Sequence, residues 1–306
     1  MGEKPAPSEV SDTFLKRAHE LIDQDWANTE REVYPREALF RYPFPTHLRR
    51  FPRWVREVRR SYRRMQSGDF RDLPPEEDLR QYPPYYRRTF HWQTDGYLSH
   101  ESAQLYDLGV EFLFLGLADV MRRQVLPPIY DHFRAQGRTP DSILDVACGT
   151  ARTMLYARDA FPEAELTGVD LSRFYLHEAS ALHGEHPKTR FRAANAESLP
   201  YADASFDAVT CVHLFHELPR SARRNVFREM RRVLRPGGIL VVMDSAQYAE
   251  SPEIGFALEK FSVDFHEPFH ADYVKDDLRA IAEEHGFHVT RVAPCFAAKI
   301  VVATPH

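Results

Sequence analysis

The 306-residue sequence has no apolar run long enough to span a membrane, and cysteine is scarce. A membrane-spanning helix needs roughly 18 or more apolar residues, so no membrane span is expected. Residues 1–10 are polar and lack the apolar segment of a secretion signal. The three cysteines, Cys148, Cys211 and Cys295, include no Cys-x-x-Cys pair, which favours reduced, buried thiols. We therefore expect a cytoplasmic protein.

The charge balance is mildly acidic, with a net charge of -5, and hydrophobic residues make up 43% of the sequence. This composition can fill the core of one large domain, or of one domain with a sizeable extension. An overall basic charge, which is typical of nucleic-acid-binding domains, is missing. We therefore do not expect nucleic acid as a partner. The oligomeric state stays open, with a homodimer among the options.

From residue 141 onward, short apolar segments alternate with helix-like segments. The seven expected strands cover residues 143–147, 165–170, 190–194, 206–212, 239–244, 289–293 and 297–303. This alternation predicts an α/β fold with a doubly wound, mostly parallel sheet of the Rossmann-like kind. Only a short turn near Pro294 separates the last two strands, so the last strand must be antiparallel.

The turn that follows the first expected strand is poor in glycine. Residues 143–151 read Ile-Leu-Asp-Val-Ala-Cys-Gly-Thr-Ala, without the Gly-x-Gly-x-x-Gly pattern that holds a pyrophosphate. Asp145 would repel a pyrophosphate, but it suits a ligand that carries an ammonium and a sulfonium. Asp170 ends the next strand, where a carboxylate can accept hydrogen bonds from both ribose hydroxyls. These features favour S-adenosylmethionine over a dinucleotide.

Five motifs occur in the order found in one large enzyme family. They are Asp-Val-Ala-Cys-Gly-Thr-Ala at 145–151, Asp170, Ala-Asn-Ala-Glu-Ser-Leu-Pro at 194–200, Ser-Phe-Asp at 205–207 and Arg-Val-Leu-Arg-Pro-Gly-Gly at 232–238. Over about residues 140–304 the chain resembles class I S-adenosylmethionine-dependent methyltransferases, particularly the ubiquinone and menaquinone C-methyltransferase group. Ala147 and Ala151 stand where that family usually has glycine. Alanine is the smallest change from glycine, so we expect binding to remain intact.

The resemblance implies which residues bind S-adenosylmethionine. Asn195 and Ala196 would meet the adenine, and Asp170 and Leu171 would bracket the ribose and adenine. The full set of expected cofactor-binding residues is Asp145, Ala147, Cys148, Gly149, Thr150, Asp170, Leu171, Asn195, Ala196 and His213. A binding role for Glu197 stays open. The cofactor-binding domain would span residues 139–306, and residues 1–138 would form a mainly helical extension that closes the substrate pocket.

A basic amphipathic helix is predicted between Arg49 and Arg64. Apolar residues recur there at alternating steps of three and four, and eight arginines fill the other faces. The apolar residues are Leu48, Phe51, Val55, Val58, Tyr62 and Met65. Such a stripe predicts that one face docks on the body of the protein. The alternatives are a surface that binds nucleic acid or an anionic membrane.

A polar and aromatic segment at residues 90–99 precedes a long apolar helix, predicted over residues 100–123 with Ser99 as its N-cap. In the family, the segment before the first strand often folds over the cofactor. The resemblance therefore suggests a substrate pocket wall, although a structural turn fits the segment equally well. The residues expected at the pocket are Trp92, Gln93, Asp95, Tyr97, Tyr106 and, from a second polar-aromatic segment, Tyr273.

Two expected loops carry side chains suited to acid-base chemistry. One follows the fourth strand and the other follows the fifth, and both should reach the carboxyl edge of the sheet. The candidate catalytic residues are His213, His216, Glu217, His266 and His270. A histidine is well matched to general-base work at neutral pH, but each of these residues could instead have a structural role. Pro268 separates His266 from His270 and disfavours a helical metal pair, so no metal is expected.

Together these features predict a methyltransferase that acts on a small molecule by in-line displacement. The aromatic pocket walls favour O- or C-methylation of a phenolic or quinonoid compound. One alternative is an RNA or protein methyltransferase that uses the arginine-rich helix as an anchor. Another is a non-catalytic protein that binds S-adenosylmethionine.

Overall fold

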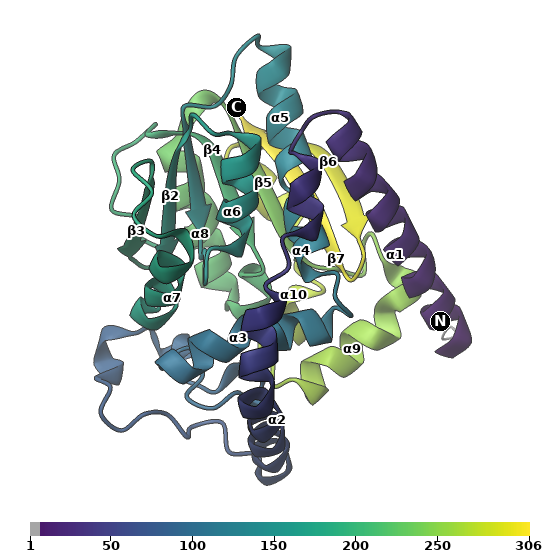
Figure 1. Cartoon of the computed structure of the whole chain (residues 1–306), viewed down its shortest axis with the longest axis vertical. Helices are drawn as coiled ribbons and strands as arrows, with labels where there is room; N and C mark the ends of the chain where they lie inside the picture. The colour runs from purple at the N-terminus through teal and green to yellow at the C-terminus, as the bar shows by residue number, and fades with distance from the viewer. Residues whose placement is uncertain (1–6) are drawn as a thin grey trace.

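The computed structural model describes residues 7–306 and has a seven-stranded sheet at its centre (Figure 1). The strand order is β3-β2-β1-β4-β5-β7-β6. Strands β1 to β5 run parallel, and β7 is antiparallel to both β5 and β6. The strands are β1 Ser142–Val146, β2 Glu165–Asp170, β3 Thr189–Ala193, β4 Phe206–Val212, β5 Leu234–Ser245, β6 Phe287–Cys295 and β7 Ala298–Pro305. The predicted fold, with its reversed last strand, is confirmed.

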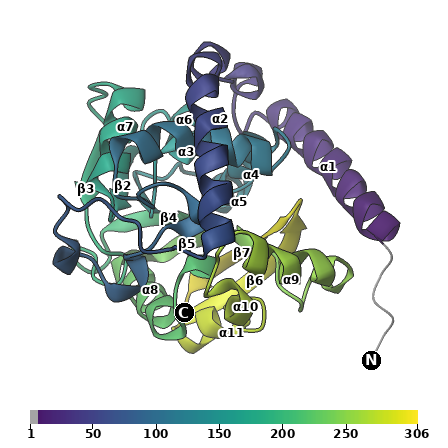
Figure 2. The ribbon, with the colours of Figure 1, turned by 90° about the horizontal axis from the view of Figure 1, so that it is seen from below.

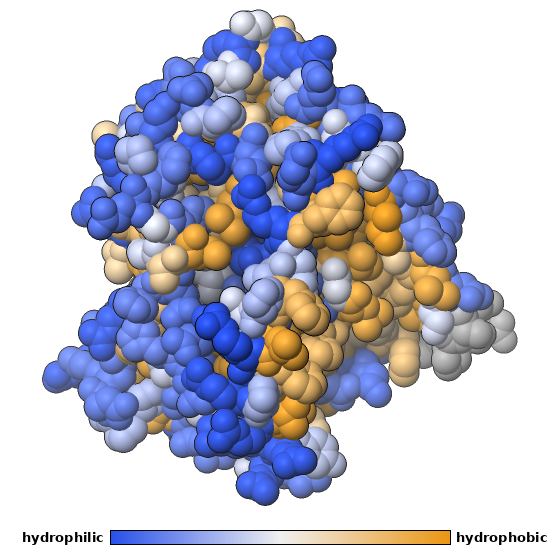
Figure 3. Space-filling view, viewed as in Figure 1, coloured by the Kyte–Doolittle hydropathy of each residue, from blue (hydrophilic) through white to orange (hydrophobic). Residues whose placement is uncertain are grey.

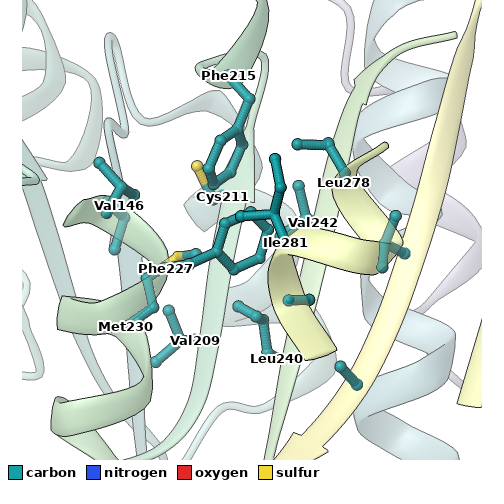
Figure 4. Close-up of a cluster of buried hydrophobic side chains, with 14 of the residues drawn as sticks. Val146, Val209, Cys211, Phe215, Phe227, Met230, Leu240, Val242, Leu278 and Ile281 are labelled. Carbon is teal, nitrogen blue, oxygen red and sulfur yellow. The ribbon is translucent and has the colours of Figure 1, made fainter. Parts of the chain in front are cut away.

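Both faces of the sheet are buried, because successive side chains of a strand point to opposite faces. In β5, Leu240 and Val242 belong to one hydrophobic cluster, while Val241 and Met243 belong to the other. Figure 4 shows the first cluster, which Phe227 of α8 and other residues of α8 and α11 cover. Residues of α1, α4, α5 and α6 cover the opposite face. These helices are α1 Pro7–Glu30, α4 Ala118–Arg123, α5 Leu126–Ala135, α6 Arg152–Ala160, α8 Arg220–Val233 and α11 Leu278–Glu284.

Most of the remaining elements gather at the carboxyl edge of the parallel strands, whereas α7 packs on β2 and β3 and η1 packs on α1 (Figures 1 and 2). They comprise α-helices and single 3-10 turns, most of them from the N-terminal region, which is helical as predicted. They are η1 Arg36–Phe40, α2 Phe44–Ser67, η2 Leu79–Gln81, η3 Pro84–Tyr86, η4 Phe90–Trp92, α3 His100–Leu113, α7 Arg173–His183, η5 Phe215–Glu217, η6 Pro252–Ile254, α9 Gly255–Asp264 and α10 His270–Tyr273. Among the helices of residues 7–306, none combines the length and hydrophobicity needed to cross a bilayer.

The long helix predicted over residues 100–123 is two helices, so that prediction is wrong. Ser99 caps the first helix as expected, since its Oγ accepts from the Ser102 amide at 3.1 Å. The helix then ends at Leu113, because Leu115 and Gly116 take left-handed backbone angles, with φ of 55° and 83°. Two successive left-handed residues cannot continue a right-handed helix. Helix α4 therefore leaves in a new direction.

The prediction that the apolar stripe of α2 docks on the body is also wrong. Polar side chains face the body instead, with His47 and Glu57 buried and Arg50 paired with Glu178 at 3.0 Å. The apolar residues Leu48 and Tyr62 are 62% and 55% exposed. Figure 3 shows this apolar strip beside a hydrophilic strip, over the place where α2 lies in Figure 1.

Candidate functional site

A cavity opens at the carboxyl edge of β1, β2 and β4, under a roof built by the N-terminal region. All ten residues expected to bind the cofactor line it. Aromatic residues of the N-terminal region and α7 form much of the opposite wall, namely Tyr85, Tyr86, Phe90, Tyr97, Tyr106 and Tyr175. The loops after β1, β2 and β4 therefore line the same cavity as these aromatic side chains. The segment from Tyr85 to Tyr106, which covers the cavity, is called the lid below.

The turn after β1 has three residues with left-handed backbone angles. They are Ala147, Gly149 and Ala151, with φ of 57°, 54° and 60°. Glycine adopts such angles freely, whereas a residue with a Cβ pays roughly 1–2 kcal/mol. The two alanines therefore hold strain at the positions where the resembling family has glycine. Hydrogen bonds from the Cys148 amide to Val169 O and from the Gly149 amide to Asp170 fasten the strained turn to β2.

Asp170 ends β2 with both carboxylate oxygens facing backbone amides. Oδ2 accepts from the Gly149 amide at 2.9 Å, and Oδ1 accepts from the Ser172 amide at 2.7 Å. Burial raises the pKa of Asp170 to about 6, against the opposing effect of these two hydrogen bonds. Each carboxylate oxygen has more than one acceptor position. Asp170 could therefore also hold a pair of ligand hydroxyls.

A carboxyl group of β1 and a guanidinium of α4 also line this cavity. Asp145 is buried and accepts from Thr210 Oγ1 at 2.7 Å, and burial raises its pKa to about 7. Arg122 of α4 is 7% exposed and lies 2.8 Å from Asp119. It lines the cavity on the side of Thr150. A carboxyl group and a guanidinium that line one cavity match the zwitterionic end of an amino acid, because a bound ammonium would stabilise the ionised form of Asp145.

Glu197 has a structural role rather than a place at the cavity wall. Its Oε1 accepts from Tyr85 OH at 2.5 Å, and its Oε2 accepts from Asn225 Nδ2 at 2.8 Å. It thereby ties the lid to α8. The Glu197 amide donates to Asn195 Oδ1 at 2.9 Å, which fixes the Asn195 side chain at the cavity.

Of the six residues expected at the substrate pocket, Tyr97 and Tyr106 line this cavity. The other four are absent from its wall. Trp92 Nε1 donates to Asp264 O at 3.1 Å, and Gln93 Nε2 donates to Tyr175 OH at 3.1 Å. Tyr273 is fully buried and donates to Ser245 O at 2.5 Å. Asp95 stands in the lid turn with a left-handed φ of 65°.

The two histidines of the loop after β4 have opposite electrostatic environments. His213 lines the cavity with its ring stacked on Phe114, and burial lowers its pKa to about 3. His216 is buried below the cavity, with Nδ1 2.6 Å from Asp244 Oδ1. Burial opposes its protonation, but the Asp244 carboxylate outweighs burial and raises the pKa of His216 to about 9. At neutral pH His213 is therefore neutral and His216 is an imidazolium.

The histidines of the second loop do not line the cavity. His266 lies between the rings of Phe70 and Trp92, at centroid distances of 4.9 and 4.5 Å. His270 is fully buried between two serine hydroxyls, 2.8 Å from Ser245 Oγ and 2.7 Å from Ser262 Oγ. Burial lowers the pKa of both rings, that of His270 to about 3. Their contacts are those of packed structural side chains.

Glu217 is the one candidate carboxylate that reaches the cavity, and it heads a buried acid-base cluster. Its Oε1 accepts a short hydrogen bond from Tyr97 OH and lies 3.5 Å from His91 Nε2. His91 Nδ1 in turn lies 3.2 Å from Glu267, whose side chain is fully buried. Burial raises the pKa of Glu267 to about 7, while the pKa of His91 is raised because the two carboxylates outweigh its own burial. A proton can therefore be shared within this cluster beside the cavity.

Comparisons with known proteins match the cofactor half of the chain. Residues 143–238 fit a family model described as a methyltransferase domain. O-methyltransferase resE of Aspergillus sclerotiorum is 32% identical over 152 residues, which cover 48% of this chain and 54% of that protein. Demethylmenaquinone methyltransferase of Thermotoga maritima is 34% identical over 144 residues, which cover 46% and 57%. Residues 143–238 therefore match a methyltransferase domain, and the strand order is the one expected for the class I S-adenosylmethionine-dependent group.

The match to a methyltransferase domain supports S-adenosylmethionine as the cofactor. The chain spans little more than half the length of the curated relatives above. A crystal structure of a SAM-dependent methyltransferase from Aquifex aeolicus shares 16% identity and has a TM-score of 0.42, covering 58% of this chain and 92% of that one. The fold is defined by the strand order rather than by this partial overlap.

Sequence patterns missed several residues that shape the methyltransferase site. Arg122 is one of 40 lysines and arginines, and nothing local distinguishes it from a surface charge. His91 enters the cluster because it and Trp92 both have left-handed backbone angles. Asp244 was not recognised as a site residue because it lies near the end of an apolar strand, outside the motifs considered. An acid that ends a buried parallel strand, as Asp145 and Asp170 do, is the signal that could have found it.

The His216–Asp244 pair predicts a pH-dependent stability of the methyltransferase. The pKa of His216 is raised in the folded state, so its contribution is complete below about 6.5 and is lost as pH rises through about 9. A shift of that size corresponds to on the order of 3 kcal/mol of unfolding free energy lost over this window. Asp244 has its pKa lowered to about 2, so it stays charged throughout.

Denaturant unfolding across this window should show a smaller decline for His216→Gln than for the wild type. The exposed His19 provides the control His19→Gln, which should follow the wild type. Buried carboxyl groups that titrate near pH 7 add a decline common to all three proteins. Equal declines in the three proteins would show that the ion pair does not carry this stability.

Proposed function

We propose that the protein transfers the methyl group of S-adenosylmethionine to an aromatic hydroxyl or an activated ring carbon of a small acceptor. The observation that carries this proposal is the Tyr97–Glu217 pair, which lines the same cavity as the strained turn and Asp170. An acid-base group and an aromatic lid are thereby next to the expected cofactor site.

The cofactor would lie across the ends of β1 and β2, with its ribose on Asp170. Its adenine would reach Asn195 and Ala196. Its ammonium would face Asp145 and its carboxylate Arg122, since these two side chains line the other end of the cavity. The sulfonium would then lie between the turn and the Tyr97–Glu217 pair. Its charge would be shielded from bulk water by the aromatic roof.

When bound, S-adenosylmethionine would supply the methyl group, and an electron pair of the acceptor oxygen or ring carbon would displace the neutral thioether S-adenosylhomocysteine from it. The acceptor proton passes to Glu217. A positioned base of this kind typically contributes a factor of about 100 to 10,000. Holding the acceptor against the methyl group contributes the remaining part of the rate enhancement through proximity and orientation.

Glu217 fits the base role better than the four candidate histidines do. His213 is too weakly basic with a pKa near 3, and His216 already carries a proton. His266 and His270 are packed away from the cavity wall. We assign His91 and Glu267 as positioning residues, because they hold Glu217 and offer its proton a path away from the acceptor.

The relatives suggest the acceptor class. One relative is named an O-methyltransferase and the other a demethylmenaquinone methyltransferase, which supports a phenolic or quinonoid acceptor. A phenolic or quinonoid ring would fit against Tyr86, Phe90 and Tyr106, which line the roof. The roof lies over the cofactor cavity, which favours a small acceptor over an RNA strand or a protein.

Asp170→Asn should weaken S-adenosylhomocysteine binding about tenfold to a hundredfold, because charge-assisted hydrogen bonds are worth about 1.5–3 kcal/mol. Wild-type affinity should rise as pH passes upward through about 6, where the carboxylate forms. The variant should lack the part of the rise that belongs to Asp170, while the rise from Asp145 near pH 7 remains in both proteins. Calorimetric titration over that pH range measures both effects. Asp203→Asn, an exposed acid, is the control, and equal affinity of all three proteins would refute the ribose assignment.

Glu217→Gln should lower kcat about a hundredfold or more while leaving S-adenosylhomocysteine affinity unchanged. The loss should shrink with an acceptor phenol that is already ionised at the assay pH, because no base is then needed. Glu283→Gln, at an exposed position of α11, is the matched control. Full activity of Glu217→Gln on a neutral phenol would contradict the base role.

The ligand atoms of His91, Glu217 and Glu267 lie within 4.8 Å of one another, close enough to bind a cation. The raised pKa of His91 instead favours an imidazolium between the two carboxylates. We therefore expect the Glu217 assay to give the same rates with and without EDTA. Loss of activity with EDTA and its recovery with Mn²⁺ would show that the cluster holds a cation rather than a proton.

A further inference from the structure

Helix α2 has three distinct faces, and two of them are turned to solvent. The face against the body is polar, and the next face carries the apolar stripe. From Phe44 to Met65 that stripe is exposed except for the half-buried Val55. One residue further around the helix comes a row of exposed arginines, Arg49, Arg56, Arg59 and Arg63. Apolar and basic stripes thus lie side by side on one protruding helix (Figures 2 and 3).

The arginine row is not neutralised by the protein. The body-facing arginines of α2 have carboxylate partners, such as Glu178 for Arg50 and Asp72 for Arg64. Within residues 7–306, no carboxylate lies at ion-pair distance from any member of the row. The one acid of α2, Glu57, is buried and accepts from the Thr94 amide. Four uncompensated positive charges therefore face outward.

The apolar stripe continues beyond α2. Phe51 and Trp54 stack with Phe112 of α3, which is itself 50% exposed, and Leu115 is 79% exposed. Monomeric proteins rarely expose contiguous apolar surface of this kind without using it. Val58 leads from the stripe into a second cavity.

The second cavity connects this surface with the methyltransferase site. Its wall is largely apolar and includes Leu105, Val110 and Leu113. Tyr106 lines both cavities, and His91, which contacts Glu217, lines the second. The second cavity therefore extends from Val58 of the exposed stripe to Tyr106 and His91. These two residues lie between the second cavity and Glu217, the proposed base.

The charge pattern identifies the partner. A second copy paired along the same stripe would bring two arginine rows together without an acid to offset them. Nucleic acid would suit the arginines but would leave Leu48, Val58 and Met65 in water. An anionic lipid surface can bind both stripes, since acyl chains can contact the apolar side chains and anionic headgroups can pair with the arginines.

We propose that α2 docks the protein on an anionic lipid surface, with the apolar stripe in the acyl boundary and the arginine row on the headgroups. On the basis of the proposed function, the second cavity then admits an acceptor with an apolar tail from the lipid side. This part depends on methyl transfer, whereas the docking itself does not.

Co-sedimentation of the full chain with vesicles tests the docking. At physiological salt the protein should bind phosphatidylcholine vesicles that contain phosphatidylserine, and should bind pure phosphatidylcholine far less. Replacing the arginine row by glutamine should lower the partition coefficient about a hundredfold or more, since each of the four arginines near the surface contributes about fivefold. The matched control is glutamine at Arg134, Arg190, Arg228 and Arg279, which are exposed on the sheet domain.

Leu48→Ser with Tyr62→Ser should also release the protein from anionic vesicles, while S-adenosylhomocysteine binding stays at the wild-type level in every variant. That titration separates loss of docking from loss of the fold or of the cofactor site. Absence of vesicle binding, or full binding by the arginine-row variant, would overturn the proposal. So would a dimer in light scattering that the Leu48→Ser change dissolves, or tighter binding to single-stranded RNA than to vesicles.

Discussion

The buried carboxylate of Asp244 holds the loop on which the acid-base cluster depends. It lies one residue before the end of β5, is fully buried and accepts from the amides of Leu214 and Phe215 at 2.9 and 2.6 Å. Its other contacts are the Ser245 amide, which donates at 2.8 Å, and the ion pair with His216. A charge buried this deeply is tolerated only when it is paired and hydrogen-bonded. These bonds therefore fix the loop after β4 in one position, and Glu217 is the next residue of that loop.

The lid is fastened to the sheet domain by contacts that also build the site. Ser172 caps α7, and its hydroxyl donates to Tyr97 O at 2.6 Å. The Tyr97 hydroxyl donates in turn to Glu217, and Tyr85 reaches Glu197. Lid, cofactor edge and acid-base cluster are thus joined by hydrogen bonds. A ligand that orders one of them would order the others.

Local patterns predicted the parts of the structure that depend on local geometry. The strands and the reversed direction of the last one follow from the apolar segments and the short turn near Pro294, and the turn after β1 is recognisable because its small residues lie close together in the sequence. Asp170 is recognisable because it is an acidic residue directly after an apolar strand segment. By contrast, the roles of His91, Arg122 and Asp244 arise from tertiary contacts between segments far apart in sequence. The break at Gly116 and the outward turn of the apolar face of α2 were missed because periodicity does not show which face meets the body.

The central claim is that the cofactor lies on Asp170 with its reactive end toward the Tyr97–Glu217 pair. A crystal structure with S-adenosylhomocysteine bound tests this most directly. Both ribose hydroxyls should lie on the Asp170 carboxylate, the amino acid end between Asp145 and Arg122, and the sulfur toward Tyr97 and Glu217. A sulfur atom turned away from Glu217, or a ribose held elsewhere, would contradict it.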